Sequence, residues 1–186
     1  MNNIQAKTFA IFAALVALMA VTRAYHFGSA LHLPDASLAV FLLAGFYLPR
    51  WTFPVLLVEA GLVDYFAINY GGVSGWCFSA AYWFLIPTYA VLWMGGRFYA
   101  TRHQFTLRGL AEFSVIAFAA TAAAFLISNA SFYLFSDNFQ TMTAVQYGVQ
   151  VAQYFVPYLQ SAFLYLSVAV ALHVALTQGS RRKQLA

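Results

Sequence analysis

The stretch TFAIFAALVALMAVTRAYH, Thr8 to His26, is the first of several long apolar runs that decide the class of this protein. It exceeds the roughly 7–15 apolar residues of a signal-peptide core. We therefore interpret it as a retained transmembrane helix rather than a cleaved leader. Alanines recur along it at four-residue spacing, which lets helices approach closely. Packing within one bundle and contact with a partner protein both explain this pattern.

The composition of the whole chain agrees with a membrane location. Of its 186 residues, 63% are hydrophobic and 8% are charged, and the mean hydropathy is +0.73. A soluble domain has about 25% charged residues, so we expect an integral membrane protein. Because each span needs roughly 20 apolar residues, no room is left for a soluble domain. We predict one all-α transmembrane domain, residues 1–186, folded as a six-helix bundle. The predicted spans are Thr8–His26, Ala36–Leu48, Thr52–Asn69, Ser79–Tyr99, Leu107–Leu134 and Thr143–Gln178, the last extending beyond the hydrocarbon or bending at Pro157.

The cationic residues indicate the orientation of the bundle. With six spans, eight of the nine Lys and Arg residues fall on one side, and Arg23 falls toward the other. The eight are Lys7, Arg50, Arg97, Arg102, Arg108, Arg181, Arg182 and Lys183. The positive-inside rule then predicts that both termini are cytoplasmic. Basic residues scattered in this way argue against a nucleic-acid partner.

Cys77 is the only cysteine, and this topology places it in the extracytoplasmic segment YGGVSGWCFS. A lone cysteine in a membrane protein is usually a small apolar side chain. However, the preceding glycines allow close backbone approach to a ligand, and Trp76, Tyr82 and other nearby aromatic residues could wall a large planar molecule. A thiolate is also a soft ligand that transition metals favour. No second cysteine or paired histidine completes a zinc site, so a metal would have to arrive inside its own organic cage.

Three of the charged residues in the predicted spans lie away from the cytoplasmic ends of those spans. Asp64 lies in the outer part of its span, Glu59 lies deeper, and Arg23 lies at a depth similar to that of Asp64. Charged residues in a bilayer usually face a cavity or a partner. Two interpretations of Asp64 remain open: an ion pair with Arg23, or a side chain directed at a ligand. Glu59 and Asp64 are five residues apart and so point about 140° apart on a helix.

The last span carries a polar stripe whose members follow helical spacing: Gln146, Gln150, Gln153, Pro157 and Gln160, with Tyr147, Tyr154 and Tyr158 alongside. Amides and hydroxyls in a transmembrane helix need partners, so the stripe either bonds to neighbouring helices or lines a cavity for an amide-rich neutral ligand. Among the histidines, His26 and His32 flank the first external loop and could touch a ligand. His103 is expected on the cytoplasmic side, and His173 is expected to be structural.

The stretch VDYFAINYGGVSGWCFSAAYWFLIPTYAVLWMGGRF, Val63 to Phe98, resembles the BtuM family, solitary vitamin B12 transporters related to the substrate-binding S-components of energy-coupling factor transporters. The spacing from Asp64 through Cys77 to Tyr82 and the GWC context of the cysteine carry the resemblance. Chain length and predicted topology agree over nearly the whole sequence.

This resemblance implies a function. Cys77 would be the axial ligand to the cobalt of cobalamin, the transported ligand, and would promote decyanation of cyanocobalamin. Asp64 and Tyr82 would organise the pocket or contact the corrinoid. Further candidate contacts are Trp76, Gly75, Tyr70, Gln153, Tyr154 and His32. The resemblance also implies a bacterial inner-membrane location and uptake without an energy-coupling module. The chain has no GxxxxGK[ST] motif, so we expect no ATP hydrolysis by the chain itself.

Three alternatives stay open from the sequence. The protein could be an S-component for another vitamin, because a shared fold does not fix the ligand. It could be a membrane enzyme that processes cobalamin, in which case decyanation would turn over. Finally, it could be an accessory subunit in which Cys77 is buried and inert.

Overall fold

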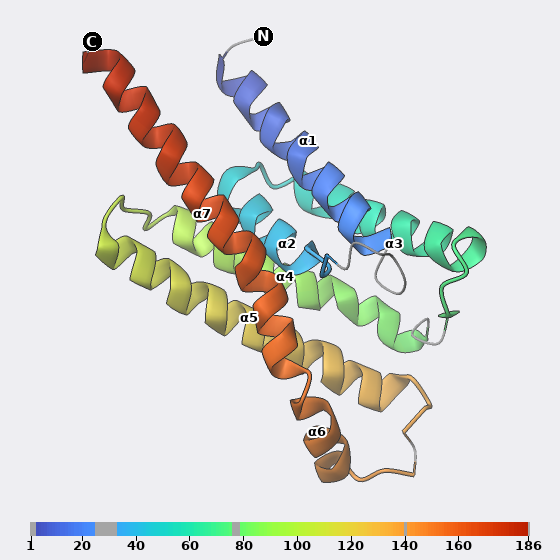
Figure 1. Ribbon diagram of the computed structural model, residues 1–186. Coiled ribbons are helices and arrows are strands. Elements are labelled where there is room, and N and C mark those ends of the chain that lie inside the picture. The colour runs from blue at the N-terminus through green and yellow to red at the C-terminus, as the bar shows by residue number, and fades with distance from the viewer. Residues whose placement is uncertain (1–2, 25–32, 76–78, 140, 186) are drawn as a thin grey trace.

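The computed structural model describes residues 3–24, 33–75, 79–139 and 141–185, and every regular element in these ranges is a helix. The chain order is seen in Figure 1. The elements are α1 (Asn3–Ala24), α2 (Ser37–Tyr47), α3 (Thr52–Tyr70), the short 3₁₀ helix η2 (Ala80–Phe84), α4 (Leu85–Ala100), α5 (Leu107–Phe135), α6 (Ala144–Ala152) and α7 (Phe155–Leu185).

Four of these helices contain segments long and apolar enough to cross a membrane: Gln5–Arg23, Thr52–Tyr70, Leu107–Phe135 and Phe155–Gln178. Large apolar side chains also cover their outer surfaces, as Val58, Leu62 and Phe66 do on α3. Such a surface suits lipid better than water. The helical, membrane-spanning character expected from the sequence is therefore confirmed, whereas the number of six spans stays a prediction.

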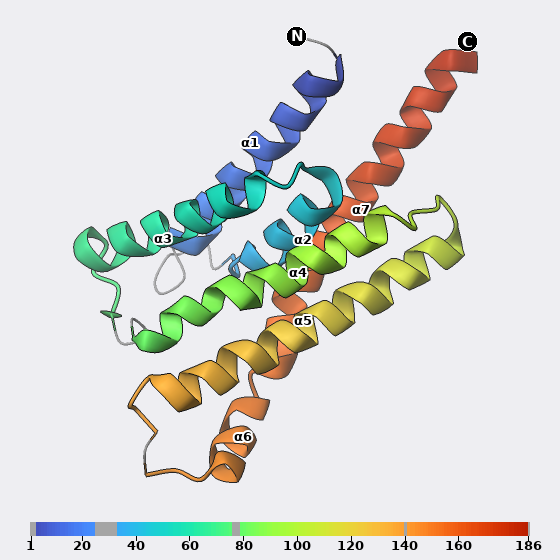
Figure 2. The ribbon, with the colours of Figure 1, turned by 180° about the vertical axis from the view of Figure 1, so that it is seen from behind.

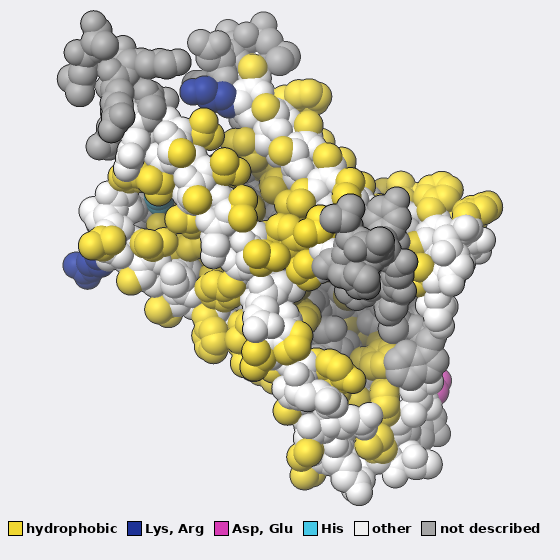
Figure 3. All heavy atoms as spheres, in the orientation of Figure 1, with side chains coloured by type: hydrophobic (Ala, Val, Ile, Leu, Met, Phe, Trp, Pro, Cys, Tyr) yellow, Lys and Arg dark blue, Asp and Glu magenta, His cyan; other side chains and the backbone are white. Residues whose placement is uncertain are grey.

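Helices α1, α3 and α5 run toward one end of the molecule, and α2, α4 and α7 run back (Figures 1 and 2). The start of α1, the connection between α4 and α5, and the end of α7 lie toward one end of the molecule (Figures 1 and 2). The connections that follow α3 and α5 lie toward the other end. On the face seen in Figure 3 hydrophobic side chains predominate, and the visible Lys and Arg side chains lie toward the end that carries the termini. The cytoplasmic location of that end stays a prediction.

Helix α2 is the buried centre of the bundle. Every residue from Ser37 to Gly45 is buried, as expected for a helix that is apolar on all sides. Helix α4 lies directly against it because two glycines remove the side chains between the backbones. A Cβ atom on Gly96 would lie 1.9 Å from the Leu42 carbonyl oxygen, and one on Gly45 would lie 2.1 Å from that of Trp93. The Phe41 and Tyr89 rings also stack between these helices, 4.1 Å apart.

The length of α2 leaves space at its ends. Its 11 residues span about 16 Å at 1.5 Å per residue, roughly half of the hydrocarbon thickness of about 30 Å. Neighbouring helices are longer and continue beyond it. The two ends of α2 therefore lie inside the bundle, and each end has polar side chains around it.

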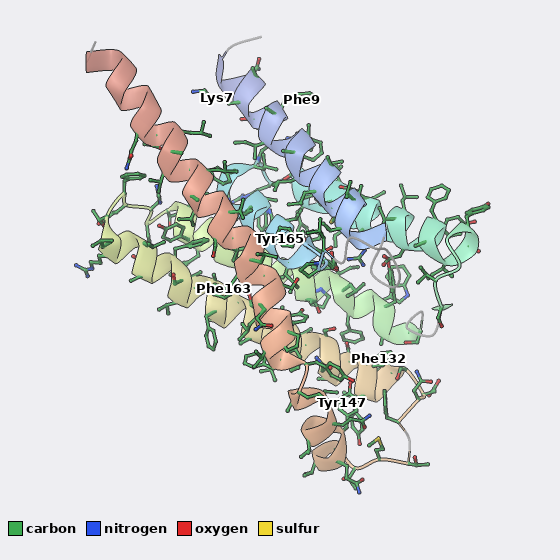
Figure 4. The ribbon with its side chains drawn as sticks, in the orientation of Figure 1. Lys7, Phe9, Phe132, Tyr147, Phe163 and Tyr165 are labelled. Atoms are coloured by element: carbon green, nitrogen blue, oxygen red, sulfur yellow. The ribbon has the colours of Figure 1, made fainter. Side chains whose placement is uncertain are left out.

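The last predicted span is two helices rather than one. Helix α6 ends at Ala152, and α7 begins at Phe155. The interruption lies just before Pro157, whose ring nitrogen cannot donate to the carbonyl of Gln153 and whose ring crowds that carbonyl. Tyr147 then packs α6 against the end of α5, with its ring 5.0 Å from that of Tyr133 (Figure 4).

The predicted span from Ser79 to Tyr99 begins with a tighter helix. The Ser79 hydroxyl accepts a hydrogen bond from the backbone N–H of Ala81 and starts η2. Pro87 then lies in the first turn of α4, where a missing N–H is harmless. The proline thus fits the start of the α-helix, and the 3₁₀ turn precedes it.

Candidate functional site

A buried ion pair joins α1 to α3 at the end of α2 that begins with Ser37. Arg23 donates from Nε to Oδ1 of Asp64 and from Nη2 to Oδ2 of Asp64, both at 2.6 Å. Arg23 is only 8% exposed. Two parallel, charge-assisted hydrogen bonds of this kind are stronger and more directional than a single contact. The Arg23–Asp64 pairing that the sequence left as one of two interpretations is therefore present.

The third nitrogen of Arg23 holds neutral partners on other helices. Nη1 donates to Ser37 Oγ at 2.9 Å and to the Tyr89 hydroxyl at 2.6 Å. Tyr82 of η2 donates its hydroxyl to Oδ2 of Asp64 at 2.7 Å. Five elements thus contribute to one cluster around a single guanidinium. We call it the Arg23 cluster: Arg23, Asp35, Ser37, Asp64, Tyr82 and Tyr89.

Asp35 completes this cluster and starts α2. Its Oδ1 accepts from the backbone N–H of Ser37 at 2.9 Å and from the Ser37 hydroxyl at 2.6 Å. Its Oδ2 lies 3.6 Å from Arg23 Nη1. A carboxylate beside the first N–H groups of a helix is also favoured by the helix dipole. Asp35 therefore links the start of α2 to the charge on α1.

Helix α7 fixes the backbone before α2. Ser161 donates its hydroxyl to the Asp35 carbonyl, and Tyr165 donates its hydroxyl to the Pro34 carbonyl, each at 2.6 Å. Figure 4 shows Tyr165 on the part of α7 that crosses this region. From α1, Thr22 Oγ1 accepts from the backbone N–H of Ala36 at 3.1 Å. The segment that carries Asp35 is therefore held in place from two sides.

The Arg23 cluster forms part of the wall of a cavity of about 250 Å³. The wall consists of Arg23, Asp35, Asp64, Ala67, Ile68, Val73, Ser74, Ala81, Tyr82, Leu85, Tyr89, Ser128 and Ser131. One guanidinium and two carboxylates give this wall a formal charge of −1. The remainder of the wall is mostly apolar. Such a site can bind an apolar body that presents a cation or hydrogen-bond donors.

The connection after α3 forms one edge of the cavity. It turns at Gly72, whose φ of 70° is the left-handed conformation that glycine adopts without strain. Val73 and Ser74 then line the cavity. Gly75 follows them, and a Cβ atom there would lie 3.6 Å from the Ile68 side chain, itself a lining residue. Gly75 thus lies beside the cavity wall.

The predicted site residues that the structure describes lie in different parts of the molecule. Asp64 and Tyr82 both line the cavity. Tyr70 is 77% exposed, and it lines a groove on the outside of α3 instead. Cys77, Trp76 and His32 lie outside the described residues.

Gln153 and Tyr154 are not among the residues that line the cavity. They lie in the break between α6 and α7, where Tyr154 is 57% exposed and Gln153 donates its amide to the Gln150 carbonyl. Another amide of the stripe, Gln146, forms a capping box with Thr143 at the start of α6. These members of the stripe thus hydrogen-bond to residues of their own helix or to its cap.

Sequence reasoning missed three residues of the Arg23 cluster: Asp35, Ser37 and Tyr89. A signal for the first two exists, because an aspartate and a serine directly before an apolar run are typical of a helix start. The signal for Tyr89 is weaker. It lies seven residues, about two helical turns, after Tyr82, so the two hydroxyls would share a face of a continuous helix.

A second polar cluster surrounds the other end of α2. Tyr47 and Nδ1 of His173 share a hydrogen bond of 2.7 Å. Tyr99 donates its hydroxyl to the Gly109 carbonyl, so Nδ1 of His103 is the donor in its 3.0 Å bond to the same hydroxyl. The two imidazole rings lie 5.3 Å apart. These four residues, which we call the tyrosine–histidine cluster, line a mostly apolar cavity of about 320 Å³.

In comparisons with known proteins, no protein-family model matches the chain, and no curated protein matches its sequence significantly.

Proposed function

We propose that this protein takes up cobalamin across a bacterial inner membrane, binding the corrinoid at the Arg23 cluster with Cys77 as an axial ligand to cobalt. The observation that carries the proposal is the position of the cavity relative to the cysteine in the chain. Cys77 is three residues after Ser74 and four residues before Ala81, and both of these residues line the cavity. The chain thus contributes to the cavity wall both before and after Cys77, which supports a role for this thiol toward a ligand bound there.

The charge of the cavity supports a metal-bearing ligand over an anionic one. The wall carries a formal charge of −1 from Arg23, Asp35 and Asp64. A vitamin that presents a free carboxylate would meet two carboxylates and a guanidinium whose three nitrogens already have partners. A corrinoid presents a cobalt cation and amide donors instead. Like-charge juxtaposition works against the anion.

Binding requires the cavity to widen, since a corrinoid is larger than about 250 Å³. The elements at its edge suit this movement: η2 is a short 3₁₀ helix, and the connection after α3 turns at Gly72. Thiolate ligation donates electron density to cobalt and weakens the bond to the ligand on the opposite face. Cyanide would then leave with its electron pair, without a change in the oxidation state of cobalt.

The test is an absorbance spectrum of the purified protein with cyanocobalamin, for the wild type and for Cys77→Ser. We expect the wild-type spectrum to shift away from the cyano form and the variant spectrum to stay unchanged. Tyr82→Phe should weaken corrinoid retention, whereas Tyr65→Phe, on an exposed side chain of α3, should not. Identical spectra without retained corrinoid in both proteins would exclude the proposal. Cyanide released per protein molecule distinguishes a single binding event from turnover.

A further inference from the structure

Glu59 is an acidic residue inside a membrane-spanning helix, and its carboxylate has no hydrogen-bond partner among the residues that the structure describes. The chain has five Asp and Glu residues, all within the described part. Both carboxylate oxygens of Glu59 are buried without a hydrogen bond, and Glu59 is the only acidic residue of which this is true. A buried polar group without a partner needs an explanation, and an ionisable residue inside a membrane is by default a functional candidate.

The surroundings of Glu59 disfavour an ionised, unpaired carboxylate. It lines a groove on the outside of α3 together with apolar residues that include Ala20, Val58 and Leu62. Tyr70 is the only other ionisable side chain among the lining residues of that groove. A charge removed from water without a partner is strongly unfavourable, and a carboxylate in that position takes up a proton instead.

Arg23 is the cation within electrostatic reach of Glu59. Ala20, which lines the groove beside Glu59, lies three residues before Arg23 on α1. Along α3, Glu59 and Asp64 are five residues apart, which is about 7.5 Å along the helix axis. The guanidinium thus interacts electrostatically with Glu59, while Asp64 holds it through two hydrogen bonds in the present arrangement.

The groove and the cavity of the Arg23 cluster are adjacent. Ala67, Val73 and Ser74 line both of them. An event in the cavity that releases Arg23 from Asp64 thus occurs beside the groove that contains Glu59. The tyrosine–histidine cluster offers no such exchange, because its members are joined to one another by neutral hydrogen bonds.

We propose that Glu59 carries a proton while Asp64 holds Arg23, and that it releases this proton to water and pairs with Arg23 when Asp64 is engaged elsewhere. Ligand binding would then be coupled to the release of one proton. The coupling to a ligand rests on the proposed function, whereas the proton on Glu59 and the exchange of partners do not.

The test is infrared spectroscopy of the full-length protein in lipid nanodiscs at neutral pH. A protonated carboxyl has a C=O stretch apart from the carboxylate bands, and this stretch shifts in D₂O. We expect such a band in the wild type and its loss in Glu59→Gln. A wild-type spectrum without that difference would overturn the proposal.

The exchange of partners is tested without any ligand in Asp64→Asn, which removes the charge that holds Arg23. The Glu59 band should disappear as Arg23 pairs with Glu59, and it should persist in the matched variant Asp64→Glu, which keeps a carboxylate. If Asp64→Asn does not fold, Asp64→Ser, which also removes the charge that holds Arg23, replaces it, and labelling of Glu59 by a hydrophobic carbodiimide is compared with that of the wild type, with less labelling expected in the variant. Persistence of the band, or equal labelling, would contradict the exchange. Failure of cobalamin to bind would exclude the proposed function and leave these results unaffected.

Discussion

The polar side chains at the two ends of α2 find partners inside the bundle in different ways. Both ends lie inside the bundle and have polar side chains around them. At the Ser37 end, one guanidinium is surrounded by carboxylates and hydroxyls from four elements. At the Tyr47 end, two tyrosines and two histidines satisfy one another. The first arrangement depends on the attraction of opposite charges and the second on neutral hydrogen bonds, so the loss of stability on removing one member should differ sharply between them.

The largest expected effect is the loss of Arg23. Arg23→Met leaves Asp64 and Asp35 without their cation, and breaking a buried pair in this way costs about 3–5 kcal/mol of stability. The measurement is the free energy of unfolding in detergent micelles. The double variant Arg23→Met/Asp64→Leu should recover part of the loss, because it also removes an unpaired charge. If Arg23→Met lowered the free energy of unfolding no more than a substitution at an exposed residue does, the two ends of α2 would not differ in how much stability depends on charge.

The next effect concerns the contact between α2 and α4 that lies between the two ends. In Gly96→Ala the new methyl would overlap the Leu42 carbonyl, and overpacking of this kind costs about 1–3 kcal/mol. Gly61→Ala is the matched control, because a Cβ atom there meets nothing within 4 Å, and alanine should stabilise α3 by about 0.5–1 kcal/mol. Thermal unfolding of both variants provides the comparison. Equal shifts in the two would show that α2 and α4 do not pack as described.

A direct comparison of the two ends uses the same substitution at each. Tyr89→Phe removes a hydroxyl that accepts from Arg23, and a hydrogen bond to a charged group contributes about 1.5–3 kcal/mol. Tyr47→Phe removes the hydroxyl bonded to His173, where a neutral bond contributes about 0.5–1.5 kcal/mol. Chemical unfolding of the two variants measures the difference. A larger loss of unfolding free energy in Tyr47→Phe than in Tyr89→Phe would contradict this expectation.

The smallest effect is expected at a charge pair outside both clusters. Arg102 and Glu112 lie 3.5 Å apart with exposed fractions of 56% and 36%, and exposed pairs contribute about 0–1 kcal/mol. Glu112→Gln should therefore leave the unfolding midpoint nearly unchanged, and added salt should change it no further. A loss comparable to that of Arg23→Met would mean that burial is not what separates these ion pairs.

Much of the fold could be predicted because its signals are local. The span predicted as Thr52–Asn69 corresponds to α3, Thr52–Tyr70. Its ends could be predicted because a charged residue, Arg50, precedes the apolar run and a glycine, Gly71, follows it. The break before Phe155 was harder to place. Pro157 indicates a bend, but whether the helix bends or separates depends on how α6 packs against α5.

The Arg23 cluster could be predicted only in part. Arg23 and Asp64 are opposite charges at similar depths in two apolar helices, so their pairing could be anticipated. Ser37 and Tyr89 join them only because α2 and α4 pack closely at Gly45 and Gly96, and sequence periodicity does not report such non-local contacts. The glutamines of the polar stripe are not among the residues that line the cavity, and the reason is related. Its regular spacing assumes one continuous helix, which the break at Gln153 interrupts.

The close contact at Gly45 and Gly96 has a mechanical consequence. Helices α2 and α4, packed backbone against backbone, would move as one rigid body, while α1 and α3 are tied to each other by the ion pair. In the Arg23 cluster these bodies are linked by hydrogen bonds from Arg23 to the uncharged groups of Ser37 and Tyr89, together with the longer Asp35 contact. Tyr82 of η2 adds a hydrogen bond to Asp64. The two bodies can therefore separate at these contacts while Arg23 keeps a carboxylate partner on α3, which is Asp64 or, after the proposed exchange, Glu59. Opening the cavity then leaves no unpaired guanidinium inside the membrane.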